Sequence, residues 1–173
     1  MFCIFVAIYY DAIETIHRVN TQLGRKAFAL DIYGPVAPQY AETFENLQAQ
    51  HGDFVTYKGV AKPEESVEIL KDYYALLFPT KFYTEGIPGT IIDAYAAGVP
   101  VITARWLNHG DIFEEGVTGL GYPFGDTRAL EQLLLELAAQ PDRLMALKPA
   151  CLKKAEQYLP ETAMERIATL IGV

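Results

Sequence analysis

A short segment of the sequence combines two carboxylates with a turn that contains glycine and proline. Glu85 is followed by Gly86-Ile87-Pro88-Gly89-Thr90-Ile91, and Asp93 comes shortly after. An ionised carboxylate can accept hydrogen bonds from neighbouring sugar hydroxyls. Free backbone N–H groups at the start of a helix can bind phosphate. The residues from 85 to 93 therefore predict a site for a phosphorylated sugar.

Part of this pattern has a purely structural interpretation. Thr90 can be the N-cap of a helix over residues 90–97, with Asp93 reaching back as in a capping box. Pro88 and Gly89, however, allow a ligand to approach the backbone closely. Both interpretations remain open for Thr90 and Asp93. The structural alternative for Glu85, a solvated acid in a loop, is weaker.

Strand-length apolar runs alternate with helix-period segments along the whole chain. Runs without polar alternation are typical of strands that are buried on both faces, and their strict alternation with helices indicates right-handed crossovers. The sequence thus predicts an α/β fold, a doubly wound parallel sheet that is Rossmann-like. Strands are expected at 2–8, 27–33, 54–57, 74–78, 99–103 and 120–122. Helices are expected at 12–23, 39–50, 63–70, 90–97, 108–115, 127–139 and 142–158.

Several further side chains are expected near the carboxyl edge of this sheet, where such folds bind ligands. Lys58, Lys81 and Arg105 lie close to the ends of predicted strands and could bind phosphate, although a single lysine or arginine is usually a solvated surface charge. Trp106 and His109 follow the fifth predicted strand. Both could face the cleft, but an isolated tryptophan usually packs on a core, so core packing is the favoured interpretation for Trp106. His109 alone is no evidence for a catalytic base or a metal site.

Composition limits the remaining possibilities. The 173 residues are 51% hydrophobic, which is enough for a single domain over 1–173 with a substantial core. The net charge of −8 argues against a nucleic-acid partner, which would need a basic face. Cys3 and Cys151 fit no metal or redox spacing and are expected to be buried free thiols. The apolar start of the chain, residues 1–10, is too short to span a membrane.

The segment EGIPGTIIDAYAAGVPVI, which begins at Glu85, resembles the signature of the retaining glycosyltransferases of family 4, with Asp93 in place of the usual second glutamate. Three other segments resemble that family in the right order: FVTYKGVAKPEESVEIL (54–70), YYALLFPTKFYTEG (73–86) and EEGVTGLGYPFGDTRALEQLL (114–134). Several linked motifs are a more specific signal than a single glycine-rich turn.

The resemblance implies one half of a GT-B fold, namely the C-terminal half that binds the nucleotide sugar. It implies that Glu85 is the catalytic residue on the donor-sugar hydroxyls and that the backbone from Gly86 to Ile91 faces the sugar and diphosphate. It further implies that Asp93 binds the ribose and that Gly59 and Val60 line the nucleobase. No metal or cofactor is implied beyond the nucleotide sugar as substrate.

One departure from the family pattern concerns the diphosphate. The family usually carries Gly-Arg and then lysine after its first strand, but residues 5–12 read Phe-Val-Ala-Ile-Tyr-Tyr-Asp-Ala. Charge-assisted hydrogen bonds are about twice as strong as neutral ones, so the loss of both cations is expected to weaken catalysis more than donor binding. Lys58, Lys81 and Arg105 are the possible replacements.

The sequence therefore predicts the donor-binding half of a glycosyltransferase that moves a sugar, with retention, to a glycan or lipid-linked acceptor. The N-terminal half would be absent, and the isolated chain is expected to be inactive. The alternatives are a degenerate binding or regulatory module and a GT-B nucleotide-sugar epimerase relative. A cytoplasmic location, with peripheral contact at the inner face of the membrane, is the expectation at family level.

Overall fold

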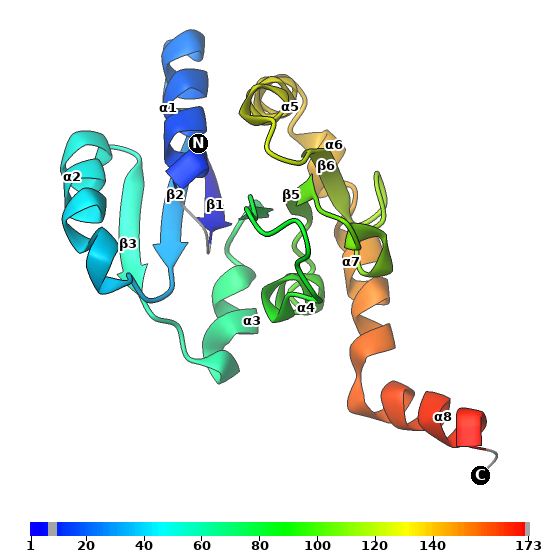
Figure 1. Cartoon of the computed structure of the whole chain (residues 1–173). Helices are drawn as coiled ribbons and strands as arrows, with labels where there is room; N and C mark the ends of the chain where they lie inside the picture. Colours follow the sequence, from blue (N-terminus) through cyan, green and yellow to red (C-terminus); the bar gives the residue numbers. More distant parts are fainter. Residues whose placement is uncertain (7–9, 172–173) are drawn as a thin grey trace.

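The computed structural model describes residues 1–6 and 10–171, which form one six-stranded sheet with helices on both sides (Figure 1). The strand order is β3-β2-β1-β4-β5-β6, and every neighbouring pair is parallel. The strands are β1 Phe2–Val6, β2 Phe28–Tyr33, β3 Val55–Gly59, β4 Ala75–Phe78, β5 Val101–Arg105 and β6 Gly119–Pro123. The predicted doubly wound sheet is confirmed, and all six strands occur where they were expected. Ala7 and Ile8, at the end of the first predicted strand, lie outside the described residues.

The order of the strands reverses between β1 and β4, which lie side by side in the sheet. The chain runs outward from β1 through β2 to β3, returns to β4 and then continues through β5 to β6. Sheets of this type bind ligands beyond the carboxyl ends of their strands at such a reversal point. The segments that follow β1 and β4 are therefore the ones that matter for a site.

Two helical layers cover the sheet. The helices are α1 Tyr10–Leu23, α2 Ala41–His51, α3 Ser66–Leu70, α4 Gly89–Ala96, α5 Thr127–Ala139, α6 Asp142–Met145, α7 Lys148–Ala155 and α8 Pro160–Ile171. Four 3₁₀ turns supplement them: η1 Pro38–Tyr40, η2 Pro63–Glu65, η3 His109–Asp111 and η4 Glu156–Tyr158. Helices α1 and α5 pack together in one layer, and α4 packs against α3 and α7 in the other.

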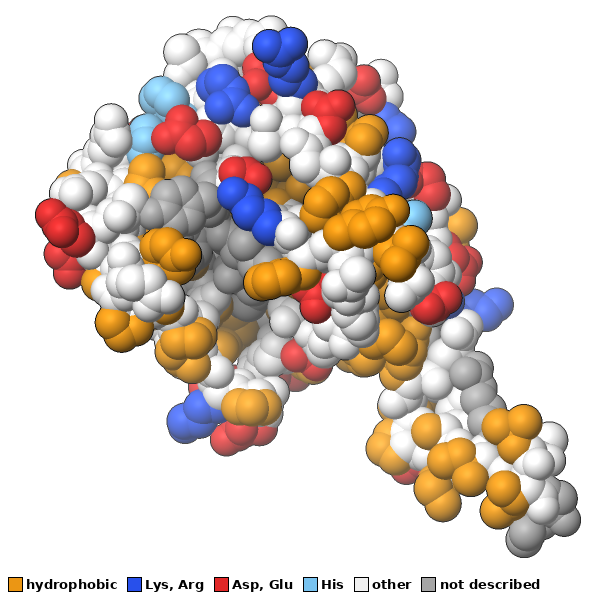
Figure 2. Space-filling model, in the orientation of Figure 1, with side chains coloured by type: hydrophobic (Ala, Val, Ile, Leu, Met, Phe, Trp, Pro, Cys, Tyr) orange, Lys and Arg blue, Asp and Glu red, His pale blue; other side chains and the backbone are white. Residues whose placement is uncertain are grey.

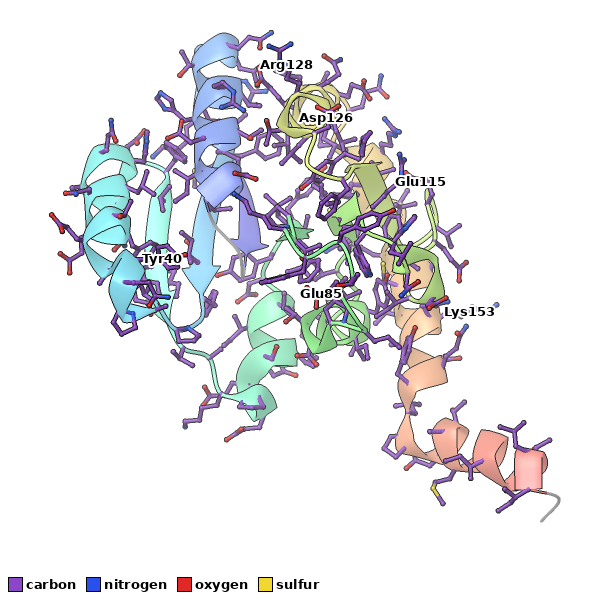
Figure 3. The ribbon with its side chains drawn as sticks, viewed as in Figure 1. Tyr40, Glu85, Glu115, Asp126, Arg128 and Lys153 are labelled. Carbon is purple, nitrogen blue, oxygen red and sulfur yellow. The ribbon has the colours of Figure 1, made fainter. Side chains whose placement is uncertain are left out.

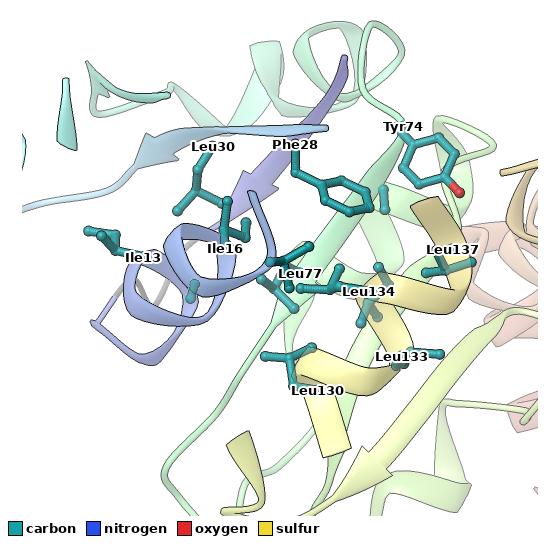
Figure 4. Packing of buried hydrophobic residues seen from close by; sticks show 14 of the residues in the cluster. Ile13, Ile16, Phe28, Leu30, Tyr74, Leu77, Leu130, Leu133, Leu134 and Leu137 are labelled. Carbon is teal, nitrogen blue, oxygen red and sulfur yellow. The ribbon is translucent and has the colours of Figure 1, made fainter. Parts of the chain in front are cut away.

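The strand β4 shows why an unbroken apolar run was needed at the centre of the sheet. Ala75 and Leu77 belong to the core beneath α1 and α5, where Leu130 and Leu134 of α5 also lie (Figure 4). The alternate residues of β4, Leu76 and Phe78, belong to a second core beneath α4. Successive side chains of a strand point to opposite faces, so a central strand with two covered faces must be apolar throughout.

Two predicted helices differ strongly from the structure, and the helix expected over 63–70 consists of η2 followed by α3. The helix expected over 142–158 is divided into α6, α7 and η4. Pro149 explains the boundary between α6 and α7, because a residue without an N–H group is tolerated at the start of a helix but not within one. The helix expected over 108–115 is only the short turn η3. The last helix, α8, was not predicted.

Helix α8 extends away from the rest of the molecule, at the red end of the chain in Figure 1. It exposes large apolar side chains, among them Met164, Ile167 and Leu170. In Figure 2 this helix is a projecting arm with many orange side chains. Within residues 1–6 and 10–171, no helix has both the length and the apolar character that a bilayer crossing requires.

The prediction of a buried free thiol is confirmed for Cys151. This side chain is fully buried and forms no disulfide, and its Sγ donates a hydrogen bond to the carbonyl of Thr118. Burial raises the pKa of the Cys151 thiol to about 12. The side chain of Cys3 lies outside the described part of the chain.

Candidate functional site

The loop from Pro79 to Pro88 joins β4 to α4 at the carboxyl edge of the sheet, and a buried threonine organises it. Thr80 is 3% exposed. Its Oγ1 accepts a hydrogen bond from the Phe82 N–H at 3.1 Å and donates one to Glu85 Oε2 at 3.0 Å. The Glu85 N–H also donates to the Phe82 carbonyl, at 3.1 Å. The Glu85 carboxylate, labelled in Figure 3, is thereby held by its own loop.

The same loop is fastened to the ends of the next two strands. The Leu107 N–H, just after β5, donates to the Tyr83 carbonyl at 2.9 Å. The Tyr83 ring meets the Phe124 ring, just after β6, edge to face at a centroid distance of 5.2 Å. Aromatic pairs in this arrangement add stability beyond their buried area. These contacts fix the loop in which Glu85 lies.

The predicted sugar-phosphate site has free hydrogen-bonding capacity. Glu85 is half-buried, and its Oε1 makes no hydrogen bond with any described residue. No described group accepts from the backbone N–H groups of Gly86, Ile87, Gly89 or Thr90 either. The N–H of Ile91 is different, because it donates to the Pro88 carbonyl at 3.0 Å and the Ile91 side chain is buried. Ile91 thus contributes to the core rather than to the free amides that were predicted.

Of the two interpretations left open for Thr90 and Asp93, the capping box does not occur in the structure. Helix α4 begins at Gly89, and its N-cap is Pro88, which offers no side-chain hydrogen bond. Thr90 already lies within the helix and so cannot cap it. Asp93 Oδ2 instead accepts a hydrogen bond from Ser66 Oγ, the first residue of α3, at 2.7 Å. Its Oδ1 has no hydrogen-bond partner among the described residues.

The turn that was predicted to face a nucleobase follows β3. Gly59 has a φ of +82°, a conformation that favours glycine. Its carbonyl accepts from the Gly34 N–H, just after β2, at 2.9 Å. Val60 is 66% exposed. The turn therefore lies at the same carboxyl edge as the Glu85 loop, separated from β4 by β2 and β1.

All three predicted phosphate cations are paired with carboxylates. Lys58 Nζ lies 3.5 Å from Asp31 Oδ2, which also accepts from the Tyr73 hydroxyl. Arg105 donates to Glu115 Oε2 through both Nε and Nη2. Lys81 Nζ lies 3.0 Å from Asp11 Oδ1. Only Lys81 belongs to the loop that holds Glu85.

A pocket of about 150 Å³ lies beside Lys81. Its lining comprises Asp11, Pro79, Thr80, Lys81, Tyr122, Phe124, Gly125 and Thr127. Burial and, to a smaller extent, the Asp11 charge raise the pKa of Tyr122, so this wall stays a neutral phenol. Ligand sites usually measure about 300–1,000 Å³, so this pocket could form only part of a nucleotide-sugar site.

Trp106 and His109, which follow β5, contact each other. Trp106 is 1% exposed and packs edge to face on Phe78, as the core interpretation predicted. His109 Nδ1 lies 2.7 Å from the Trp106 carbonyl. Across the described residues, no three His, Cys, Asp or Glu side chains are grouped as a metal site would require.

Two residues of the site were not predicted from the sequence. The sequence did contain an indication for Thr80, because this residue follows β4 almost directly and a threonine hydroxyl can form hydrogen bonds within its own loop. The indication for Asp11 was weaker, because an acidic residue in the first turn of a helix usually only stabilises the helix dipole.

The family model described as glycosyl transferases group 1 matches residues 6–140. The amylovoran biosynthesis glycosyltransferase AmsK of Erwinia amylovora is 25% identical over 165 residues, which are 92% of this chain and 40% of that protein.

Solved structures resemble the chain over 99% of its length. The pneumococcal O-GlcNAc transferase GtfA, in complex with UDP and GlcNAc, gives a TM-score of 0.79 at 21% identity over 35% of its own length. HepE of Anabaena, in complex with UDP and glucose, gives 0.77 at 13% identity over 48% of its length. Sucrose-phosphate synthase of Thermosynechococcus elongatus gives 0.74 at 22% identity over 44% of its length. The chain therefore has the Rossmann-like fold of GT-B glycosyltransferases and spans less than half the length of these relatives.

Proposed function

The chain belongs to the glycosyl transferases group 1 family, and we propose that it is the donor-binding half of a retaining family 4 glycosyltransferase. In this proposal it binds a nucleotide diphosphate sugar whose sugar is transferred to a glycan or lipid-linked acceptor. The observation that carries the proposal is the Glu85 loop: Thr80 holds one carboxylate oxygen and leaves the other free, next to unoccupied backbone N–H groups.

Each part of the loop has a defined task in this proposal. Glu85 Oε1 accepts hydrogen bonds from donor-sugar hydroxyls, since an ionised carboxylate is only an acceptor. The amides of Gly86, Ile87, Gly89 and Thr90 bind the sugar and diphosphate oxygens at the positive end of α4. Asp93 keeps Ser66 on Oδ2 and offers Oδ1 to the ribose. Gly59 and Val60 face the base.

The proposal includes a second half that binds the acceptor. The matched relatives are more than twice as long as the region that they share with this chain. The pocket beside Lys81 is small for a whole nucleotide sugar, which supports a cleft with a second wall. The exposed apolar side of α8, with Met164 and Ile167, provides a surface that such a half could cover.

Titration calorimetry tests donor binding directly. We expect the chain to bind one of the UDP-, GDP- or ADP-sugars, and no heat of binding at millimolar ligand would overturn the proposal. Glu85→Gln should weaken sugar-dependent affinity about tenfold, the worth of one charge-assisted hydrogen bond. Its affinity for the nucleoside diphosphate alone should not change. Glu42→Gln, at the start of α2, is the matched control. Equal losses for the nucleotide sugar and the nucleotide would show that Glu85 does not contact the sugar.

A second candidate function is a module that binds nucleotide sugars without catalysis. The observation that favours it is that Lys58, Lys81 and Arg105 all pair with carboxylates of the chain. Neutralised cations stabilise a leaving diphosphate less well. A two-domain protein that supplies the acceptor half separates the two functions: release of nucleoside diphosphate with an acceptor present supports the transferase, and binding without release supports the module.

A further inference from the structure

Lys81 and Asp11 come from the two segments that flank the reversal point of the sheet. Asp11 lies in the first turn of α1, after β1, and Lys81 lies in the loop after β4. The two strands are neighbours, with Val6 opposite Leu77. The ion pair, 3.0 Å between Lys81 Nζ and Asp11 Oδ1, therefore spans the point at which a ligand enters this type of fold.

The pair also borders the rest of the candidate site. Both side chains line the pocket of about 150 Å³, and Thr80 lines it as well. Thr80 is the residue that holds the Glu85 carboxylate. A ligand that reaches Glu85 with one end is thus placed to meet Lys81 with the other.

Lys81 is better placed than the other two cations to exchange its carboxylate partner for a ligand. Arg105 is held by two hydrogen bonds to Glu115, which also accepts from the Gly121 N–H. Lys58 lies on β3, beyond β2 and β1. Lys81, in contrast, has a side chain that is 57% exposed, and its ion-pair partner is 34% exposed. Exposed pairs of this kind contribute only about 0–1 kcal/mol.

We propose that Lys81 binds the diphosphate of the donor and that Asp11 is a resident competing anion which the diphosphate must displace. The inference rests on the proposed donor-binding function. A diphosphate carries more charge than one carboxylate and forms charge-assisted hydrogen bonds to an ammonium group. It can therefore take Lys81 from Asp11, while Asp11 lowers the affinity for every phosphate ligand. Asp11 would pair with Lys81 again once the diphosphate leaves.

Titration calorimetry on the whole chain tests the two assignments with UDP, GDP, ADP and inorganic pyrophosphate. Asp11→Asn should tighten the binding of pyrophosphate and of the preferred nucleotide up to about fivefold, the equivalent of an exposed ion pair. Lys81→Met should weaken both. Glu136→Gln makes the same change in net charge at the far end of α5, in another exposed ion pair, and should change neither. Uridine, guanosine and adenosine, which lack phosphate, should bind all variants equally.

The outcomes separate this inference from the proposed function. Unchanged or weaker binding by Asp11→Asn, or unchanged binding by Lys81→Met, overturns the ion-pair assignment even if nucleotide sugars bind. If pyrophosphate binds more tightly to Asp11→Asn and more weakly to Lys81→Met, but no nucleotide binds, the phosphate site is supported and the donor proposal is overturned. Absence of all binding, in the unmodified chain and in Asp11→Asn, overturns both. Circular dichroism and thermal melting of each variant show that the fold is kept.

Discussion

Thr80→Val provides a sharp test of how the Glu85 loop is organised. Valine has nearly the same shape as threonine, so the substitution removes two hydrogen bonds from a side chain that is 3% exposed and leaves its packing almost unchanged. The lost hydrogen bond from the Phe82 N–H is worth about 1 kcal/mol, and the lost bond to the Glu85 carboxylate adds about 1 kcal/mol because that group is half-buried and partly solvated. We expect a loss of about 2 kcal/mol in the free energy of unfolding.

For a domain of this size, that loss corresponds to a fall of about 4–8 °C in Tm. Urea unfolding and thermal melting measure both quantities. Titration with the preferred nucleotide sugar should show a weaker, sugar-dependent affinity, because Glu85 must then be ordered by the ligand. Thr80→Ser keeps the hydroxyl and is the control, with both bonds retained. If Thr80→Val matches Thr80→Ser in stability and in sugar affinity, Thr80 does not position Glu85.

Three further substitutions test the framework around the site. Tyr95→Phe should cost about 1–2 kcal/mol in urea unfolding, because the fully buried hydroxyl bonds to the Ile112 carbonyl and to Thr118 Oγ1; a change below 0.5 kcal/mol would contradict this. Asp126, labelled in Figure 3, is the N-cap of α5, and its carboxylate accepts hydrogen bonds from two backbone N–H groups. Asp126→Ala should therefore cost about 1 kcal/mol in the free energy of unfolding, whereas Asp126→Asn should cost much less. Cys151→Ala tests the buried thiol through pH. The pKa of this thiol is about 12 in the folded chain and ordinarily 9.0, so above pH 9 the folded chain keeps a proton that the unfolded chain loses. The stability that this group contributes is therefore fully present below pH 9 and declines as the pH rises toward 12. The unmodified chain should therefore lose more stability than Cys151→Ala between pH 8.5 and 11, and parallel losses would refute the assignment.

The elements that the sequence identified well are those with a strong local signal. The helix at 127–139 was predicted with the bounds that α5 has, since its leucines recur at helical spacing and Asp126 precedes it. The six strands were found because buried parallel strands need long apolar runs. The helix over 142–158 failed where Pro149 restarts it, and α8 was missed altogether.

For the candidate site, the amino-acid sequence indicated which segment to consider, because Glu85 and the small residues after it are adjacent in the chain. It could not determine the partners. Asp93 pairs with Ser66, which is 27 residues away, rather than capping its own helix. Lys81 meets Asp11 only because β1 and β4 are neighbours in the sheet. Local patterns fix the elements, but contacts between residues far apart in sequence depend on strand order, which only the folded sheet decides.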